Sequence, residues 1–137
     1  MVHPQNYKFQ TMIRPVDTTG ATATDIEVDT RGYDYLTVIV TLGSVAANMT
    51  ALKLQESDSS GASEADFTGS AFTAPTSSDD NKLYVAFIDL RKRKRYISIV
   101  ATGGAGATLI SAVGMLSRAE VTPTTAAERG AAEQLIP

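Results

Sequence analysis

The chain has 137 residues, the usual size of a single domain and enough to enclose a core. Hydrophobic residues make up 43% of it and charged residues 20%, proportions that exclude an intrinsically disordered protein. The formal net charge is -3, and the absence of cysteine excludes disulfides, thiolate metal sites and cysteine nucleophiles. No apolar run approaches the ~20 residues that span a bilayer, and the N-terminus lacks the pattern of a secretory signal. We therefore expect neither a membrane partner nor secretion.

Strand patterns dominate the first half of the chain. Residues 7–16 predict a first strand, and residues 24–28 predict a second one in which apolar and acidic side chains alternate. Residues 33–42 are rich in β-branched and aromatic side chains and predict a central strand. Residues 51–57 alternate leucine with polar side chains, which is typical of a strand with one face in water.

The middle of the chain has a different composition. Residues 58–81 are rich in serine, glycine, threonine and aspartate, and they predict a long exposed loop. Phe67 and Phe72 interrupt this polar stretch, so a short edge strand between them remains an open alternative.

Strand patterns return at residues 82–90, 95–102 and 107–116. We expect these segments to form a β-meander of two hairpins, with the glycines of residues 103–106 supplying positive φ in the second turn. Many short strands without a helical period predict an all-β protein, an antiparallel β-sandwich or jelly-roll-like single domain.

The C-terminal segment differs from the strands before it. We predict a β-sandwich domain over residues 1–118 and an extended arm or tail over residues 119–137, which contains small residues and alternating charges. A short helix from Pro123 with Thr122 as its cap is possible, although Gly130 weakens it by about 1 kcal/mol relative to alanine. An arm that docks on a partner and a frayed tail both remain open.

Residues with catalytic chemistry are scarce. His3 is the single histidine, and without a second histidine or a cysteine neither a serine triad nor a zinc site is expected. The acidic residues between positions 25 and 34 alternate with apolar side chains or flank turns, which is typical of a solvent-facing strand rather than of a glycosidase pair. We expect a protein that is not an enzyme and that needs no cofactor.

Five consecutive cations, which we call the basic block, lie between two expected strands at positions 91–95. The rest of the chain is acidic and the block has no interleaved aromatic side chains, so we expect little contact with nucleic acid. Contact with an acidic protein surface, including a neighbouring copy of the chain, is favoured over nucleic acid. A solvated turn remains the third interpretation.

Several stretches together resemble a known group of proteins. They are "YDYLTVIVTLG", "ALKLQESDSSGASEADFTG", "AFIDL", "RKRYISIVAT" and "LISAVGMLSRAE", which lie between residues 31 and 120. In this combination the chain resembles the small β-sandwich proteins that tailed bacteriophages encode near their major capsid genes. The shared motifs are structural and include no catalytic signature.

The resemblance implies a capsid decoration, or cement, protein that binds the outside of a phage capsid in many copies and stabilises the shell. Its expected partner is the major capsid protein, its expected state is a homo-oligomer with a trimer favoured, and its expected location is the virion exterior after assembly in the host cytoplasm. The alternative is a carbohydrate- or receptor-binding module of a phage tail or bacterial surface, which the lack of tryptophan disfavours. The expected protein-interface residues are Arg91, Lys92, Arg93, Lys94, Arg95, Arg129, Leu135 and Ile136.

Overall fold

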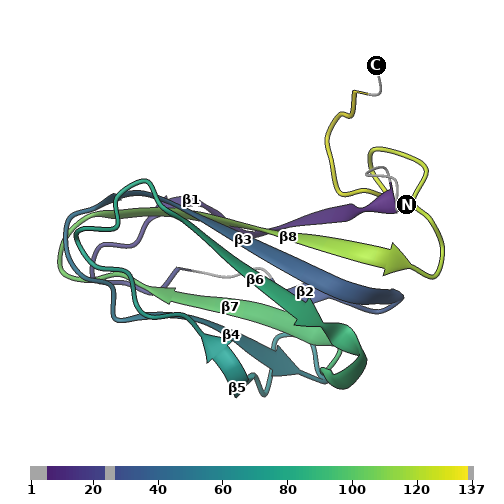
Figure 1. Ribbon diagram of the computed structural model, residues 1–137, viewed down its shortest axis with the longest axis horizontal. Helices are drawn as coiled ribbons and strands as arrows, with labels where there is room; N and C mark the ends of the chain where they lie inside the picture. Colours follow the sequence, from purple (N-terminus) through teal and green to yellow (C-terminus); the bar gives the residue numbers. More distant parts are fainter. Residues whose placement is uncertain (1–5, 24–26, 136–137) are drawn as a thin grey trace.

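Two antiparallel four-stranded sheets pack face to face in the computed structural model, which describes residues 6–23 and 27–135 (Figure 1). Sheet A has the order β1-β8-β3-β6 and contains β1 (Lys8–Asp17), β8 (Thr108–Ala119), β3 (Tyr33–Val45) and β6 (Leu83–Asp89). Sheet B has the order β2-β7-β4-β5 and contains β2 (Val28–Asp29), β7 (Tyr96–Thr102), β4 (Ala51–Ser57) and β5 (Ala65–Ala71). None of the described residues forms a helix that is long and apolar enough to cross a membrane.

The strand pairing is nested from the outside inward. The first strand pairs with the last, β2 pairs with β7, β3 with β6 and β4 with β5. This is the pairing of one long hairpin that has been folded over into two sheets, and with eight strands it gives a jelly roll. The predicted antiparallel β-sandwich is therefore confirmed.

The core lies between the two sheets and follows from the alternation of side chains along each strand. Leu36, Val38, Val40 and Leu42 of β3 point inward and are at most 2% exposed. Leu52 and Leu54 of β4, with Ile97 and Ile99 of β7, are buried on sheet B. Each such side chain contributes about 1.5–3 kcal/mol when it is fully removed from water, so these central strands dominate the stability of the domain.

Several expected strands are found where the sequence placed them. β3 lies between β8 and β6, which confirms its central position. The polar stretch 58–81 contains β5 at the edge of sheet B, so the edge-strand alternative is confirmed there. The second strand, expected at residues 24–28, is found as the short β2 from Val28, and residues 24–26 lie outside the described residues.

The expected β-meander is wrong. β6 pairs with β3, β7 pairs with β2 and β4, and β8 pairs with β1 and β3, so the last three strands pair with none of one another. The turn between β7 and β8 crosses from sheet B to sheet A. Its glycines permit close packing rather than positive φ: a Cβ at Gly103 would lie 1.9 Å from the carbonyl oxygen of Thr18, and one at Gly104 2.2 Å from that of Asn48.

Candidate functional site

The basic block lies in the connection that crosses from sheet A to sheet B. Its first residues belong to the 3-10 turn η2 (Leu90–Lys92), in which Leu90 is buried and the Asp89 carboxylate accepts a hydrogen bond from the Arg91 backbone. The remaining residues lead into β7, which begins at Tyr96. The block is thus a turn at the surface between β6 and β7.

Four of the five cations in the block have a carboxylate partner in the same chain. The nitrogen-to-oxygen distances are 2.5 Å for Arg91–Asp89, 3.7 Å for Arg93–Glu56, 3.7 Å for Lys94–Asp58 and 2.7 Å for Arg95–Asp29. Lys92 forms no ion pair with any residue that the structure describes. The positive field of the block is therefore largely compensated within the chain, which leaves little attraction for a distant acidic surface or for phosphate.

Two of these pairs are bidentate and fix the connection in place. Arg91 donates from Nε and Nη2 to Asp89, and Arg95 donates from the same two atoms to Asp29. The Arg91 side chain lowers the pKa of Asp89 to about 2, and the Arg95 side chain holds the pKa of Asp29 below its usual value. Arg93 adds a stacking contact, with its guanidinium carbon 4.7 Å from the centre of the Phe67 ring. These contacts tie the connection to both sheets.

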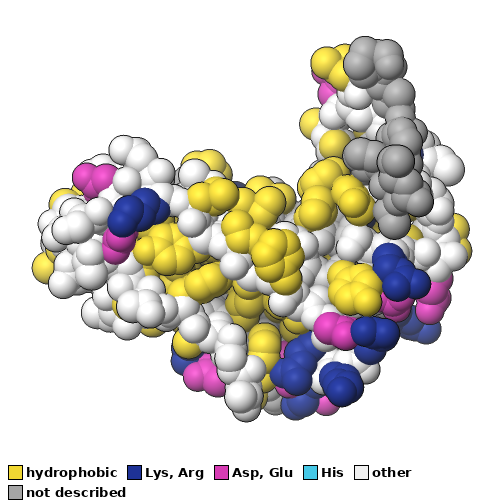
Figure 2. Space-filling view, viewed as in Figure 1, with side chains coloured by type: hydrophobic (Ala, Val, Ile, Leu, Met, Phe, Trp, Pro, Cys, Tyr) yellow, Lys and Arg dark blue, Asp and Glu magenta, His cyan; other side chains and the backbone are white. Residues whose placement is uncertain are grey.

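The sequence reasoning missed an apolar surface on the outer face of sheet A. Eight large hydrophobic side chains of the described residues are exposed, and six of them belong to strands of this sheet: Phe9, Val16, Leu83, Phe87, Leu109 and Val113. Figure 2 shows hydrophobic side chains gathered over these strands, whereas the charged side chains gather around the basic block. Phe87 is the most prominent of the six and is 82% exposed.

The strand register places three of these six side chains, Phe9, Phe87 and Val113, in two adjacent rows across the sheet. One row crosses the sheet through Phe9, Met115, Thr37 and Phe87, and the next through Thr11, Val113, Ile39 and Val85. Neither row contains a charged residue. We call these eight residues the sheet A face.

Charged side chains appear only at the border of the sheet A face. Tyr35 is the next outward-facing residue of β3 beside the first row, two residues before Thr37. The guanidinium groups of Arg91 and Arg118 lie 5.5 and 5.8 Å from the centre of its ring. An apolar centre with a charged border is the usual anatomy of a protein interface.

One signal in the sequence could have revealed the sheet A face. β6 reads "LYVAFID", with apolar side chains at both odd and even positions, and β8 shows the same in "TLISAVGML". Strands that are apolar on both faces are typical of sheets that are covered on both sides. In this sandwich sheet B covers only the inner side, and no strand of the described residues covers the outer side.

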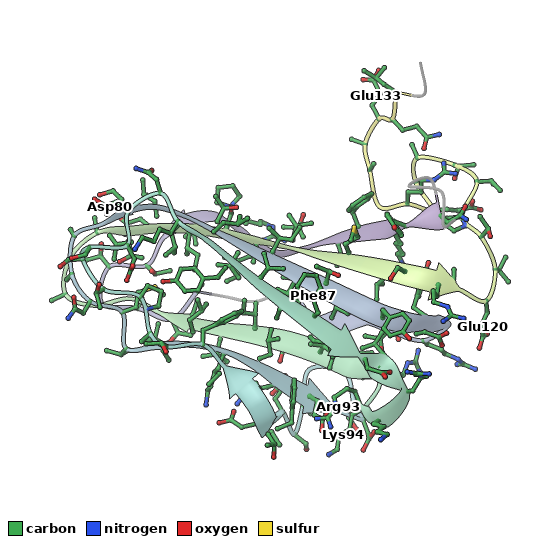
Figure 3. The ribbon with its side chains drawn as sticks, in the orientation of Figure 1. Asp80, Phe87, Arg93, Lys94, Glu120 and Glu133 are labelled. Atoms are coloured by element: carbon green, nitrogen blue, oxygen red, sulfur yellow. The ribbon has the colours of Figure 1, made fainter. Side chains whose placement is uncertain are left out.

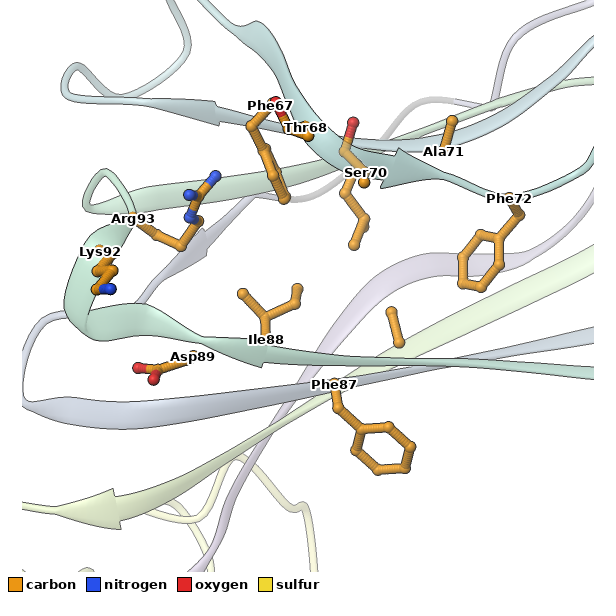
Figure 4. Close-up of a pocket in the computed structure, with 13 residues that line it drawn as sticks. Phe67, Thr68, Ser70, Ala71, Phe72, Phe87, Ile88, Asp89, Lys92 and Arg93 are labelled. Carbon is orange, nitrogen blue, oxygen red and sulfur yellow. The ribbon is translucent and has the colours of Figure 1, made fainter.

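A groove of about 310 Å³ lies between the edge strands β5 and β6 (Figure 4). Leu54 and Ile88 reach it from the core, Phe67 and Phe72 flank it on the β5 side, and Lys92 and Arg93 lie at one end. Phe87 points away from this groove and toward the sheet A face (Figure 4). The groove and the sheet A face are therefore separate surfaces on the two sides of β6.

The C-terminal segment after β8 is built around a capped turn. Thr124 and Thr125 donate backbone hydrogen bonds to the Glu128 carboxylate at 2.7 and 3.1 Å, and these bonds lower the pKa of Glu128. The Glu128 amide donates in return to the Thr125 hydroxyl, which completes a capping box. Thr125 thus has the capping role that the sequence suggested for Thr122, and a turn replaces the possible helix.

Arg129 is only 8% exposed and holds the same segment together from inside. Its guanidinium donates to the carbonyl oxygens of Pro123 and Thr124 and to the side chain of Gln134, at 2.6 to 2.8 Å. Leu135, by contrast, is 86% exposed, and Ile136 lies outside the described residues. The structure therefore separates the expected interface residues into a compensated basic block, a buried Arg129 and an exposed Leu135.

No arrangement of three or more His, Asp or Glu side chains in the described residues is suited to holding a metal ion. No protein-family model matches the sequence, and no curated protein matches it either.

Proposed function

We propose that this protein is a structural virion component that binds the outside of a phage capsid in many copies and stabilises the shell. The observation that supports this proposal is the uncharged sheet A face, which exposes Phe87 and its apolar neighbours on a side of the sheet that no described strand covers. Contiguous apolar patches with a polar border mark protein interaction sites on soluble domains.

The sheet A face is suited to a modest contact that is repeated many times. Its β-branched and aromatic side chains have few rotamers to lose, and the paired strands beneath them hold the surface rigid. Burial of a Phe87-sized side chain contributes about 1.5–3 kcal/mol, of which association entropy removes a part. A closed shell supplies many equivalent positions, so weak contacts add up when one particle binds many copies.

The basic block has a smaller part in this proposal than the sequence suggested. Because four of its five cations are paired within the chain, an acidic partner would have to compete with the carboxylates already bound. Lys92 has no ion pair among the described residues and is therefore the member of the block best placed to meet a carboxylate of another molecule. We therefore assign the main shell contact to the sheet A face.

A binding module for carbohydrate or a receptor is the second candidate, and one observation favours it. Phe9, Tyr35 and Phe87 lie on the outer side of one sheet, and exposed aromatics on a sheet face are the expected platform for a sugar ring. Their neighbours are valine, isoleucine, methionine and threonine, which offer few of the polar groups that orient a sugar. The jelly roll itself occurs in both viral capsid and lectin domains and does not decide between them.

Quantitative mass spectrometry of density-purified virus particles tests the proposal. We expect hundreds of copies per particle, near a simple ratio to the shell protein. Phe87→Lys should lower that occupancy, whereas Val121→Lys, at a side chain that is 83% exposed but outside sheet A, should leave it unchanged. A handful of copies per particle, or full occupancy by the Phe87→Lys variant, would contradict the proposed role.

A further inference from the structure

The C-terminal segment is attached to β1 by a close backbone contact. The Phe9 amide donates to the Arg129 carbonyl at 2.7 Å, and a Cβ at Gly130 would lie only 1.9 Å from the Phe9 carbonyl oxygen. Gly130 has φ of 72°, and its amide and that of Ala131 form the two hydrogen bonds of a Schellman motif. The direction in which the chain leaves this turn is therefore fixed by its own hydrogen bonds.

Residues 131–135 leave the sandwich beyond this turn. From here on the word arm means these five residues, which are only the outer part of the predicted segment 119–137. Figure 1 shows the chain running away from both sheets, and Glu133 in Figure 3 lies far from the strands. The arm carries one acidic side chain, Glu133, and ends in the exposed Leu135. A rigid base that presents an apolar side chain to solvent loses little entropy on docking, as is typical of a binding element.

The β5–β6 groove has the properties that such an arm needs. It lies between two edge strands, whose outer backbone groups are open to pairing with an added strand. Phe67, Phe72 and Ile88 supply apolar surface. Lys92, which forms no ion pair with any described residue, supplies a cation at one end, where Asp89 is already paired with Arg91. In an extended arm Glu133 and Leu135 face the same side, about 7 Å apart, so both can enter one groove.

We propose that the arm of one copy docks in the β5–β6 groove of a second copy, with Leu135 on the apolar lining and Glu133 beside Lys92. The arm starts on β1 and the groove follows β6, which are the opposite edges of sheet A. When such a contact is not returned by the same partner it is heterologous, and repetition of it closes a ring when the rotation permits. This contact joins copies to each other and does not depend on the proposed shell contact.

Reversal of the charge at Glu133 or at Lys92 tests the proposal, with the oligomeric state measured by sedimentation velocity. We expect the full chain to form a small closed oligomer. Glu133→Lys and Lys92→Glu should each weaken its assembly roughly three- to tenfold, because each places like charges together. The chain with both substitutions should recover most of the loss, since every arm then meets a groove of opposite charge.

The apolar part of the contact has its own variant and control. Leu135→Asp should weaken assembly roughly ten- to a hundredfold, whereas Val121→Asp, at an equally exposed position outside the arm, should not. A labelled synthetic peptide of residues 130–137 should bind the Leu135→Asp chain and shift the amide resonances of β5 and β6.

Each of several results would overturn the arm contact. They are a monomeric full chain, unchanged assembly of the Leu135→Asp variant, no recovery in the double charge variant, and peptide-induced shifts that avoid β5 and β6. Sedimentation of the purified chain measures the arm contact without particles, and particle occupancy of the native chain measures the shell contact. An intact oligomer that is absent from particles would refute the proposed function and leave the arm contact in place.

Discussion

Substitution of Gly130 by alanine should release the C-terminal segment from β1 without unfolding the sandwich. The new Cβ would meet two obstacles, a backbone with φ of 72° and the Phe9 carbonyl oxygen 1.9 Å away. The left-handed backbone costs about 1–2 kcal/mol for a residue with a Cβ. A separation of 1.9 Å between carbon and backbone oxygen forces a shift of about 1 Å, which breaks the Phe9–Arg129 hydrogen bond and removes about another 0.5–1.5 kcal/mol.

Together these terms oppose docking of the segment by roughly 1.5–3.5 kcal/mol, before any gain from relaxation. Because the segment lies outside the main core cluster, the chain should respond by local undocking rather than by global unfolding. Amide hydrogen exchange of Phe9 measures this directly, since its N–H donates to Arg129. We expect fast exchange at Phe9 and unchanged protection in β3.

Gly61→Ala is the matched control. Gly61 has φ of 66° and no atom within 4 Å of its added Cβ, so it carries the backbone penalty without the clash. In the Gly61→Ala variant the Phe9 amide should keep its native hydrogen-exchange rate. A protected Phe9 amide in the Gly130→Ala variant would refute our account of how the arm is held.

Three further predictions concern the sandwich itself. Val38→Asp should abolish cooperative thermal unfolding, because Val38 is 0% exposed at the centre of β3 and an unpaired charge has no compensation there. Truncation after Glu120 should preserve the β-sheet circular dichroism signal, since β8 ends at Ala119; loss of sheet content would show that the removed segment supports the core. Arg91 lowers the pKa of Asp89 to about 2, so the stabilisation by this pair is present above the ordinary pKa of 3.8 and is lost as pH falls toward 2. Denaturant midpoints between pH 5 and pH 2 should therefore fall less steeply for Asp89→Asn than for the native chain, and parallel curves would contradict this.

The sequence was sufficient to find the strands but not their partners. The alternation in β4 and the β-branched run of β3 are local patterns, and both strands lie where those patterns placed them. Pairing depends on long-range packing, which is why three consecutive strands were wrongly joined into a meander. Gly103 and Gly104 illustrate the difficulty, because their role depends on backbone segments more than fifty residues away in sequence.

The candidate site was predictable only in part for a similar reason. Five adjacent cations draw attention in a linear sequence, but their carboxylate partners come from β2, β4, the residue directly after β4 and the end of β6, and only the fold brings these together. The residues of the sheet A face, by contrast, are far apart in the sequence and do not draw attention there. They are spread over four strands and become one surface only through the register.

The two proposed contacts reinforce each other through symmetry. In a closed ring every copy is related to the next by rotation about one axis, so all sheet A faces have the same tilt toward that axis and toward the same side of the ring. A shell with matching local symmetry would then engage several faces at once, and the first contact would raise the effective concentration of the rest. Removal of the arm should therefore weaken attachment to the shell even though the arm does not touch it. Removal of the arm should lower the number of copies bound per particle far more than Lys92→Glu does, because that substitution weakens the ring but leaves the arm present.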